Sequence, residues 1–345
     1  MKYAVGYQLA EGNESPFSEI VRPYREHISE VYFPWMDIPS GRSALSTRRG
    51  DTDWTAQARL EEDLAAIKSF GIKLDLLFNG NCYGSKAMSV QLRNQVLSIL
   101  AHLRDCVGGV DIITTTSPFI AETVKKYFPE VEVRASVNMW LGTIKSMEYL
   151  KDIFDSYYVQ REFNRDLDHI RKLKSWCDKN GKKLYMLANS GCFAYCTGHT
   201  FHDNLVAHEA EIADTVNVSD FMPYTCWRCL KDPENRHMVL QNSWVRPEDI
   251  HNYEGLFDTV KLATRMHSRP AMVIDAYIRQ RYYGNLLDLM EPGFGPAFAP
   301  YIVDNQLLPE DFFKVTSSCG RKCESCDYCK KALEKALVKM DPTSL

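Results

Sequence analysis

The chain has 345 residues, of which 45% are hydrophobic and 25% are charged, and these fractions are ordinary for a folded globular protein. Its 41 basic and 45 acidic residues give a net charge of −4, which excludes the strongly basic field that drives non-specific binding to nucleic acids. The N-terminus lacks the apolar core of a signal peptide, and no stretch reaches the roughly 18 apolar residues of a membrane helix. We therefore expect a cytoplasmic protein without a membrane span.

Short β-rich runs alternate with longer amphipathic helical patterns, which is typical of repeated βα units around a parallel sheet. The runs predict eight strands, at residues 3–9, 30–33, 73–78, 111–115, 131–136, 156–160, 183–188 and 259–263. The patterns between them predict helices at 18–26, 56–70, 89–106, 118–127, 144–153 and 167–180. Eight units favour an α/β fold of the closed (β/α)8 TIM-barrel type, although an open doubly wound sheet has a similar pattern.

The predicted barrel occupies residues 1–290, and a C-terminal extension occupies 291–345. An insertion at about 192–245 separates the seventh and eighth strands, and it is far longer than an ordinary connection. In a barrel this insertion emerges at the C-terminal face, where active sites form. Residues 271–290 predict a closing helix before the Pro- and Gly-rich stretch EPGFGPAFAP. The polar loop 39–54 is predicted to be either a substrate-facing flap or an ordinary solvated loop.

Cysteine spacing is the most informative chemical signal in the chain. Eight of the eleven cysteines are grouped, and clustered thiols in a reducing compartment more often bind metal than form disulfides. Cys192 and Cys196 follow the seventh strand, and Cys226 and Cys229 come thirty residues later. Two such pairs can place four thiolates around one centre, either a tetrahedral zinc ion or a cubane iron–sulfur cluster.

The C-terminal extension holds the second group, in the run CGRKCESCDYC. Its members are Cys319, Cys323, Cys326 and Cys329. They predict a second centre, either a 4Fe–4S cluster or zinc. The C-x3-C-x2-C spacing also occurs in radical S-adenosylmethionine enzymes, but there it lies near the start of the barrel and not after it.

Polar residues at the C-terminal ends of barrel strands can reach a ligand in the barrel mouth. Four are candidate catalytic residues: Arg161, Glu162, Lys261 and Arg265. Four are candidate substrate-binding residues: Asn79, Asn81, Asn138 and Asn189. Lys261 and Arg265 can hold a carboxylate or phosphate, and Arg161 and Glu162 can orient or protonate a substrate. Each can instead belong to a structural ion pair.

Residues 131–269 resemble the U32 peptidase-like family in four segments that occur in the family's order. These segments are VRASVNMW, YYVQREFNRDLDHI, LANSGCFAYCTG and RPEDIHNYEGLFDTVKLATRMHSRP. The family includes oxygen-independent hydroxylases of ubiquinone biosynthesis and of RNA bases. The resemblance implies a barrel with one 4Fe–4S cluster held by Cys192, Cys196, Cys226 and Cys229. In the family the first two cysteines are usually further apart, so Cys82 is an alternative ligand.

The resemblance implies an iron–sulfur enzyme that hydroxylates, or otherwise modifies by a redox reaction, a small aromatic molecule or an RNA base. Its partners would be an electron-donor protein and a homologous or heteromeric subunit. One alternative is a non-catalytic subunit stabilised by iron–sulfur or zinc. Another is a peptidase, as the family name suggests, but His199, His202 and His208 lack the H-E-x-x-H order of a zinc protease.

Overall fold

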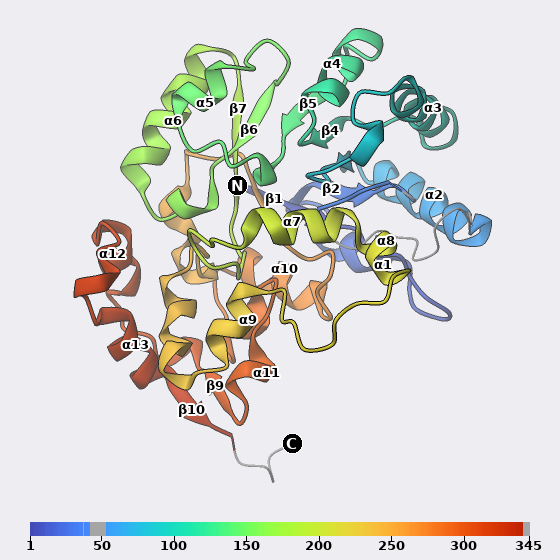
Figure 1. Ribbon diagram of the computed structural model, residues 1–345. Helices are drawn as coiled ribbons and strands as arrows, with labels where there is room; N and C mark the ends of the chain where they lie inside the picture. Colours follow the sequence, from blue (N-terminus) through green and yellow to red (C-terminus); the bar gives the residue numbers. More distant parts are fainter. Residues whose placement is uncertain (37, 42–52, 341–345) are drawn as a thin grey trace.

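The computed structural model describes residues 1–36, 38–41 and 53–340 (Figure 1). Eight parallel strands form a closed barrel in chain order: β1 (Lys2–Gly6), β2 (Ile28–Pro34), β3 (Lys73–Phe78), β4 (Ile112–Thr115), β5 (Glu132–Ala135), β6 (Ser156–Tyr158), β7 (Lys183–Leu187) and β8 (Thr259–Lys261). The first and last strands pair in parallel, with Tyr3 opposite Val260. This closure confirms the predicted TIM-type barrel and its eight strands, and it rules out the open sheet.

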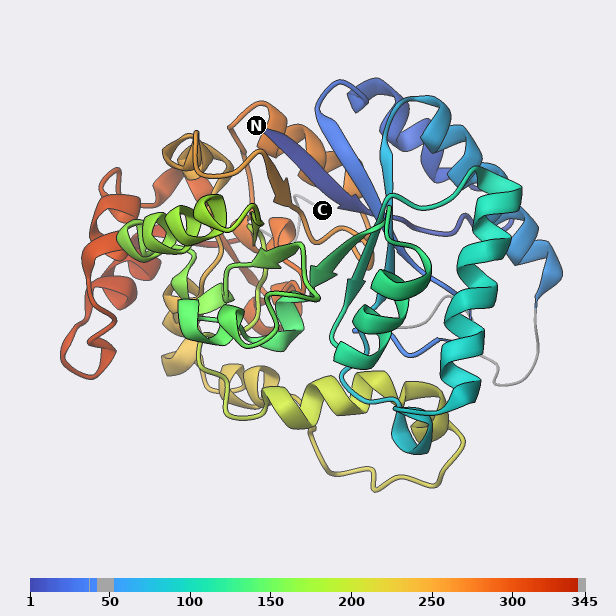
Figure 2. The same cartoon turned by 90° about the horizontal axis from the view of Figure 1, so that it is seen from above.

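Helices cover the outside of the barrel between successive strands (Figure 2). They are α1 (Phe17–Val21), α2 (Trp54–Ser69), α3 (Val90–Val107), α4 (Pro118–Tyr127), α5 (Ile144–Glu148) and α6 (Leu167–Lys179). Side-chain caps start several of them, since Ser89 and Asp166 accept hydrogen bonds from backbone N–H groups of the first turn. Short 3₁₀-helices lie in the connections: η1 (Arg22–Tyr24), η2 (Gly84–Lys86), η3 (Val137–Met139) and η4 (Arg161–Phe163).

The interior of the barrel holds an ion-pair network as well as apolar side chains. Arg134 is fully buried and donates to both carboxylate oxygens of Glu30, at 2.6 and 3.1 Å. It also donates to Glu132 at 3.1 Å, and its guanidinium lies 3.7 Å from the centre of the Tyr185 ring. Because buried charges cost free energy unless they are paired, this network fixes the relative positions of the strands that carry it.

The insertion between β7 and β8 forms α7 (His199–Ala207), α8 (Glu209–Ala213), α9 (Thr225–Leu230), η5 (Pro233–Gln241) and η6 (Pro247–Tyr253). α7 lies across the C-terminal ends of the strands (Figure 2). The predicted loop 39–54 has most of its length, 42–52, outside the described residues. Within the described residues, no helix is long and apolar enough to cross a membrane.

The C-terminal part follows β8 and packs beside the insertion (Figure 1). It contains α10 (Pro270–Ile278), η7 (Leu286–Leu289), α11 (Gly295–Phe298), β9 (Tyr301–Val303), η8 (Asn305–Leu307), α12 (Phe312–Ser318), η9 (Cys323–Ser325), α13 (Tyr328–Ala336) and β10 (Leu337–Lys339). β9 and β10 pair antiparallel. The prediction of one helix over 271–290 was wrong, because α10 ends at Ile278 and the chain turns at Gln280, which has a φ of 53°.

Candidate functional site

A pocket opens at the mouth of the barrel, and eight of the predicted site residues line it. They are Asn79, Asn138, Arg161, Cys192, Cys196, Cys226, Lys261 and Arg265. These residues come from the ends of five strands and from α9, so only the closed barrel brings them together. The other four predicted residues of this region, Asn81, Glu162, Asn189 and Cys229, are not among the described residues that line the pocket.

Hydrogen bonds from two neighbouring segments hold the loop that carries Cys192 and Cys196. Asn242 donates to the carbonyl of Gly191 at 2.9 Å and accepts from the backbone N–H of Ala194 at 3.3 Å. Glu162 accepts from the backbone N–H of Tyr195 at 3.0 Å. One carboxylate oxygen of Glu162 therefore contacts the cysteine loop, and the other, Oε2, is buried without a hydrogen-bond partner among the described residues.

Two glycines let this loop approach its neighbours closely. A Cβ at Gly191 would fall within 3.0 Å of the carbonyl oxygen of Pro292, and a Cβ at Gly198 would fall within 3.0 Å of the Thr225 hydroxyl. Real Cβ atoms essentially never come so close to other heavy atoms. Because Thr225 begins α9, the approach at Gly198 brings Cys226 beside the first cysteine pair.

The thiols of Cys192, Cys196 and Cys226 influence one another. Burial raises the pKa of the Cys226 thiol to about 11, and the neighbouring thiols of Cys192 and Cys196 add to that rise. Thiolates crowded in this way repel one another unless a cation lies between them. Metal ions bind cysteine as the thiolate, so an iron centre would supply the missing positive charge. The residues therefore fit a thiolate-bound metal centre.

An aromatic cluster lies behind the cysteines. The Phe294 ring lies 5.9 Å from that of Phe193 and 5.4 Å from that of Trp227, measured between ring centres. Phe193 follows Cys192, and Trp227 lies between Cys226 and Cys229. Such an apolar shell limits solvent access, which tunes the reduction potential of a metal centre.

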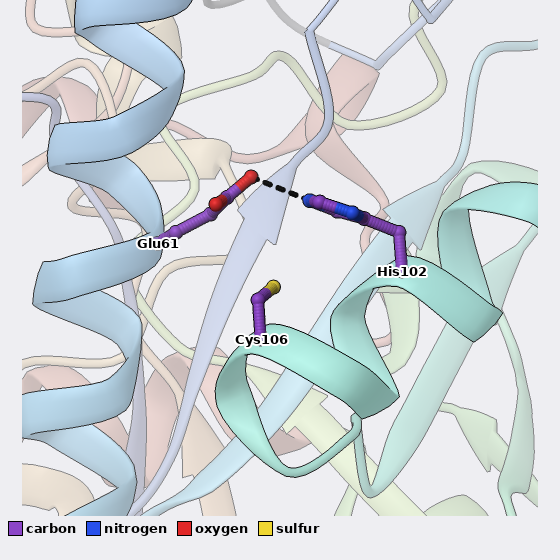
Figure 3. A group of neighbouring side chains, drawn as sticks. All are labelled: Glu61, His102 and Cys106. Atoms are coloured by element: carbon purple, nitrogen blue, oxygen red, sulfur yellow. Dashed lines mark hydrogen bonds and ion pairs between the residues drawn. The ribbon is translucent and has the colours of Figure 1, made fainter.

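One close group of candidate metal ligands lies outside the pocket. Among the described residues, three candidate metal-ligating atoms lie within 4.8 Å of one another only in the group Glu61, His102 and Cys106, on the outer helices α2 and α3 (Figure 3). The sequence predicted no site at these three residues.

The pocket is also lined by cationic and aromatic side chains. The Arg161 guanidinium lies 4.6 Å from the centre of the Trp140 ring. The ammonium of Lys261 lies 3.8 Å from the centre of the Tyr32 ring. Burial lowers the pKa of Lys261 to about 8, and Arg134 and Arg265 lower it further, although Asp75 and Glu30 act in the opposite direction. This lining suits an aromatic or anionic ligand.

Comparison with known proteins finds one relative in sequence and one similar solved fold. No family model matches the chain. The uncharacterized protease MJ1657 of Methanocaldococcus jannaschii is 25% identical over 289 residues, which are 80% of this chain and 82% of that protein. The structure of the U32 peptidase Mk0906 matches with a TM-score of 0.54 and 17% identity, and the match covers 76% of this chain and 93% of that one. The chain is therefore similar in fold to a U32 peptidase.

Several predicted binding residues support the pocket through hydrogen bonds. Asn79 accepts hydrogen bonds from the Ser40 hydroxyl at 3.2 Å and from the Gly41 backbone at 3.0 Å. Asn189 donates to the carbonyls of Ala263 and Leu289, and it accepts from the backbone N–H of Ala263 at 2.6 Å. Asn189 thereby ties the ends of β7 and β8 together, and its polar atoms face the backbone.

Other members of the predicted set lie at the rim. Asn81 donates to Asp203 at 3.0 Å and to the carbonyl of Asn138 at 3.4 Å. Arg265 donates to the hydroxyl of Ser40 at 2.9 Å. These contacts join α7 and the loops after β2, β3, β5 and β8 around the opening.

Sequence reasoning missed several residues that line the pocket: Tyr32, Trp140, Asp203 and Glu291. Trp140 stands at the end of the segment VRASVNMW and has a left-handed φ of 55°. His199, which also lines the pocket, lies with its ring centre 4.1 Å from that of Trp140. Glu291 comes from the C-terminal extension, so the extension contributes to the pocket directly. The position of Trp140 after a predicted strand was the available signal.

The four C-terminal cysteines also lie near one another. Burial raises the pKa of the Cys329 thiol to about 11, and the thiols of Cys323, Cys319 and Cys326 raise it as well, against the guanidinium of Arg165. Arg321, within this cysteine run, lies 5.7 Å from the centre of the Tyr195 ring. Because Tyr195 lies between Cys192 and Cys196, the tail adjoins the first cysteine loop.

Cys82 lies apart from the four-cysteine centre. Its thiol is hydrogen-bonded to His208, which directly follows α7, whereas Cys196 lies just before the start of α7. The nine residues of α7 span about 13 Å at 1.5 Å per residue. This separation argues against Cys82 as a substitute ligand.

Proposed function

We propose that this chain is an iron–sulfur enzyme that binds a 4Fe–4S cluster through Cys192, Cys196, Cys226 and Cys229. Its reaction would be an oxygen-independent hydroxylation, or a related redox modification, of a small aromatic molecule or a nucleobase. The observation that carries the proposal is the shared pocket, which three cysteines line together with aromatic and cationic side chains.

The side chains of the pocket have separate roles in this proposal. When bound, the cluster would supply or accept single electrons. Trp140 and Tyr32 would contact the flat face of an aromatic substrate, since aromatic rings prefer stacked or edge-to-face contacts. Arg161, Lys261 and Arg265 would hold its polar or anionic groups. Glu162 and Asn242 would keep the cysteine loop in position.

The C-terminal cysteines support a second proposed centre. Cys319, Cys323, Cys326 and Cys329 would hold another 4Fe–4S cluster, or zinc. The contact between Arg321 and Tyr195 places this group next to the first cysteine loop, which suits an electron relay toward the pocket. An electron-donor protein in the cytoplasm would then dock near the tail.

The decisive experiment measures iron, sulfide and zinc in protein purified without oxygen, together with its electron paramagnetic resonance spectrum after reduction. We expect about eight irons with matching sulfide if both groups hold cubane clusters, and about four if only the barrel group does. Cys192→Ala and Cys229→Ala should each remove the barrel cluster and spare the tail cluster. Cys106→Ala, at an exposed cysteine outside both cysteine groups, is the matched control and should retain the iron of both groups.

Zinc without iron would contradict the redox proposal and favour a zinc-stabilised binding subunit. Iron content unchanged in both ligand variants would refute the ligand assignment. The reaction itself is tested without dioxygen by incubating the oxidised protein with RNA and with small aromatic compounds, with water as the source of the oxygen atom and a chemical electron acceptor to take the two electrons. A mass gain of one oxygen atom, lost in the Cys192→Ala variant, is the expected result.

A further inference from the structure

Cys82, His208 and Glu211 form a side-chain cluster at the end of α7 that lies away from α9 and both cysteine groups. The Cys82 sulfur accepts a hydrogen bond from the backbone N–H of Gly84 at 3.4 Å and is also hydrogen-bonded to the His208 ring. Nδ1 of His208 lies 3.1 Å from a carboxylate oxygen of Glu211. A Cβ built on Gly84 would lie 3.8 Å from Cε1 of His208, so the ring packs against the loop that carries Cys82.

The hydrogen bonds of this cluster favour a thiolate next to an imidazolium. The hydrogen bond to His208 lowers the pKa of Cys82, and the Gly84 N–H lowers it too, whereas burial and the Glu211 carboxylate act in the opposite direction. The hydrogen bond to Cys82 raises the pKa of His208, and the hydrogen bond to Glu211 adds to this, against burial. The thiol is only partly buried, so small reagents can reach it.

Cys106 provides a natural contrast, because it also lies beside a histidine and a glutamate (Figure 3). There too the histidine is paired with the carboxylate, since Nε2 of His102 lies 2.7 Å from Glu61. Burial raises the pKa of Cys106, and the carboxylates of Glu61 and Asp105 add to the rise. The same three residue types therefore lower the pKa of the thiol in one cluster, where the ring is hydrogen-bonded to the sulfur, and accompany a raised pKa in the other.

We propose that Cys82, His208 and Glu211 form a nucleophilic centre that attacks acyl carbonyl groups, such as those of esters, thioesters or amides. A nucleophile bonded to a base, which a third group orients, is the arrangement of covalent hydrolases. This centre goes beyond the proposed redox function and does not depend on a cluster.

The reaction needs no oxidant or metal. The sulfur of Cys82 forms a bond to the carbonyl carbon, the bond to the leaving group breaks, and His208 gives a proton to the leaving group. Water then attacks the thioester, His208 accepts its proton, and the Cys82 thiolate is released. Glu211 holds the imidazole ring in the required orientation as a positioning residue.

The test uses the full chain, purified without oxygen, with p-nitrophenyl acetate at pH 7. Acetylation of each cysteine is followed by peptide mass spectrometry, and thioesters are identified by their removal with neutral hydroxylamine. We expect Cys82 to be acetylated several-fold faster than Cys106, because the pKa of the Cys82 thiol is lowered, that of Cys106 is raised, and the thiolate is the reacting form.

Variants distinguish activation of the Cys82 thiol by His208 from simple solvent exposure of that thiol. His208→Ala should reduce acetylation of Cys82 to the rate of Cys106, Glu211→Gln should slow it partially, and Cys106→Ala should leave it unchanged. Iron content and circular dichroism equal to those of the unaltered protein show that each variant is folded. The proposal is overturned if Cys82 reacts no faster than Cys106, or if His208→Ala has no effect on the acetylation rate of Cys82. It is also overturned if Cys82→Ser removes iron, because Cys82 would then be a metal ligand.

Failure of the redox proposal would give a different result, in which iron is missing and acetylation of Cys82 is intact.

Discussion

Replacing Gly191 by alanine tests whether close packing of the cysteine loop decides metal binding. Gly191 directly precedes Cys192, and its backbone N–H donates to the carbonyl of Glu291 at 3.0 Å. A Cβ at this position would fall within 3.0 Å of the Pro292 carbonyl oxygen, 3.2 Å from Cβ of Met290 and 3.3 Å from the Pro292 carbonyl carbon. All three atoms belong to one segment, and two of them are backbone atoms. No side-chain rotation can relieve the closest contact.

The expected loss of stability in Gly191→Ala follows from these close contacts. Either the cysteine loop or the segment 290–292 must move by most of an ångström, and overpacking of this kind typically costs about 1–3 kcal/mol. Movement of the loop would also disturb the hydrogen bonds from Asn242 and the position of Cys192. We therefore expect Gly191→Ala to lower the free energy of unfolding by about 2 kcal/mol and to lose most of the barrel iron.

The assay combines urea denaturation with iron content per chain in anaerobically purified protein. Gly295→Ala is the matched control, because no atom lies within 4 Å of a Cβ built there, and its stability should change by less than about 0.5 kcal/mol. If Gly191→Ala has both the stability and the iron content of the control, then close approach at Gly191 does not determine the centre.

Three further predictions concern other parts of the molecule. Arg134→Met should destabilise the chain by about 3–5 kcal/mol in urea denaturation, because it leaves the buried Glu30 carboxylate unpaired. The control Arg171→Met, at a surface ion pair, should cost less than about 0.5 kcal/mol. Equal effects of the two variants would contradict a buried network. Because burial lowers the pKa of Lys261 to about 8, its ammonium should be present below pH 8 and lost above it. Nuclear magnetic resonance of ¹³C-methylated lysines should then show a signal with a midpoint near 8 that is missing in Lys261→Arg; a midpoint near the ordinary 10.5 would refute the shift. Folding disfavours that ammonium, so its destabilising effect should fade as the pH rises from 8 toward 10.5. Cys326→Ala should lose only tail iron, and loss of all iron would indicate that the two centres depend on each other.

The sequence by itself determined the repeating elements and the position of the first cysteine group. The strands and outer helices follow from local periodicity, as in Leu60, Leu64 and Ile67, which form one buried helix face. Cys192 and Cys196 were expected at the barrel mouth because they follow a predicted strand. The error at 271–290 has a local cause, since apolar residues continue past Ile278 although the chain turns at Gln280.

Only the tertiary structure decided which distant residues meet. Cys82 and His208 are far apart in sequence, and no local pattern links a thiol after β3 to a ring after α7. Nor does a local pattern show that one oxygen of Glu162 accepts a hydrogen bond from the backbone of Tyr195. Such contacts depend on the closure of the barrel and on the path of the insertion across its mouth, because strands distant in sequence become neighbours only when the sheet closes.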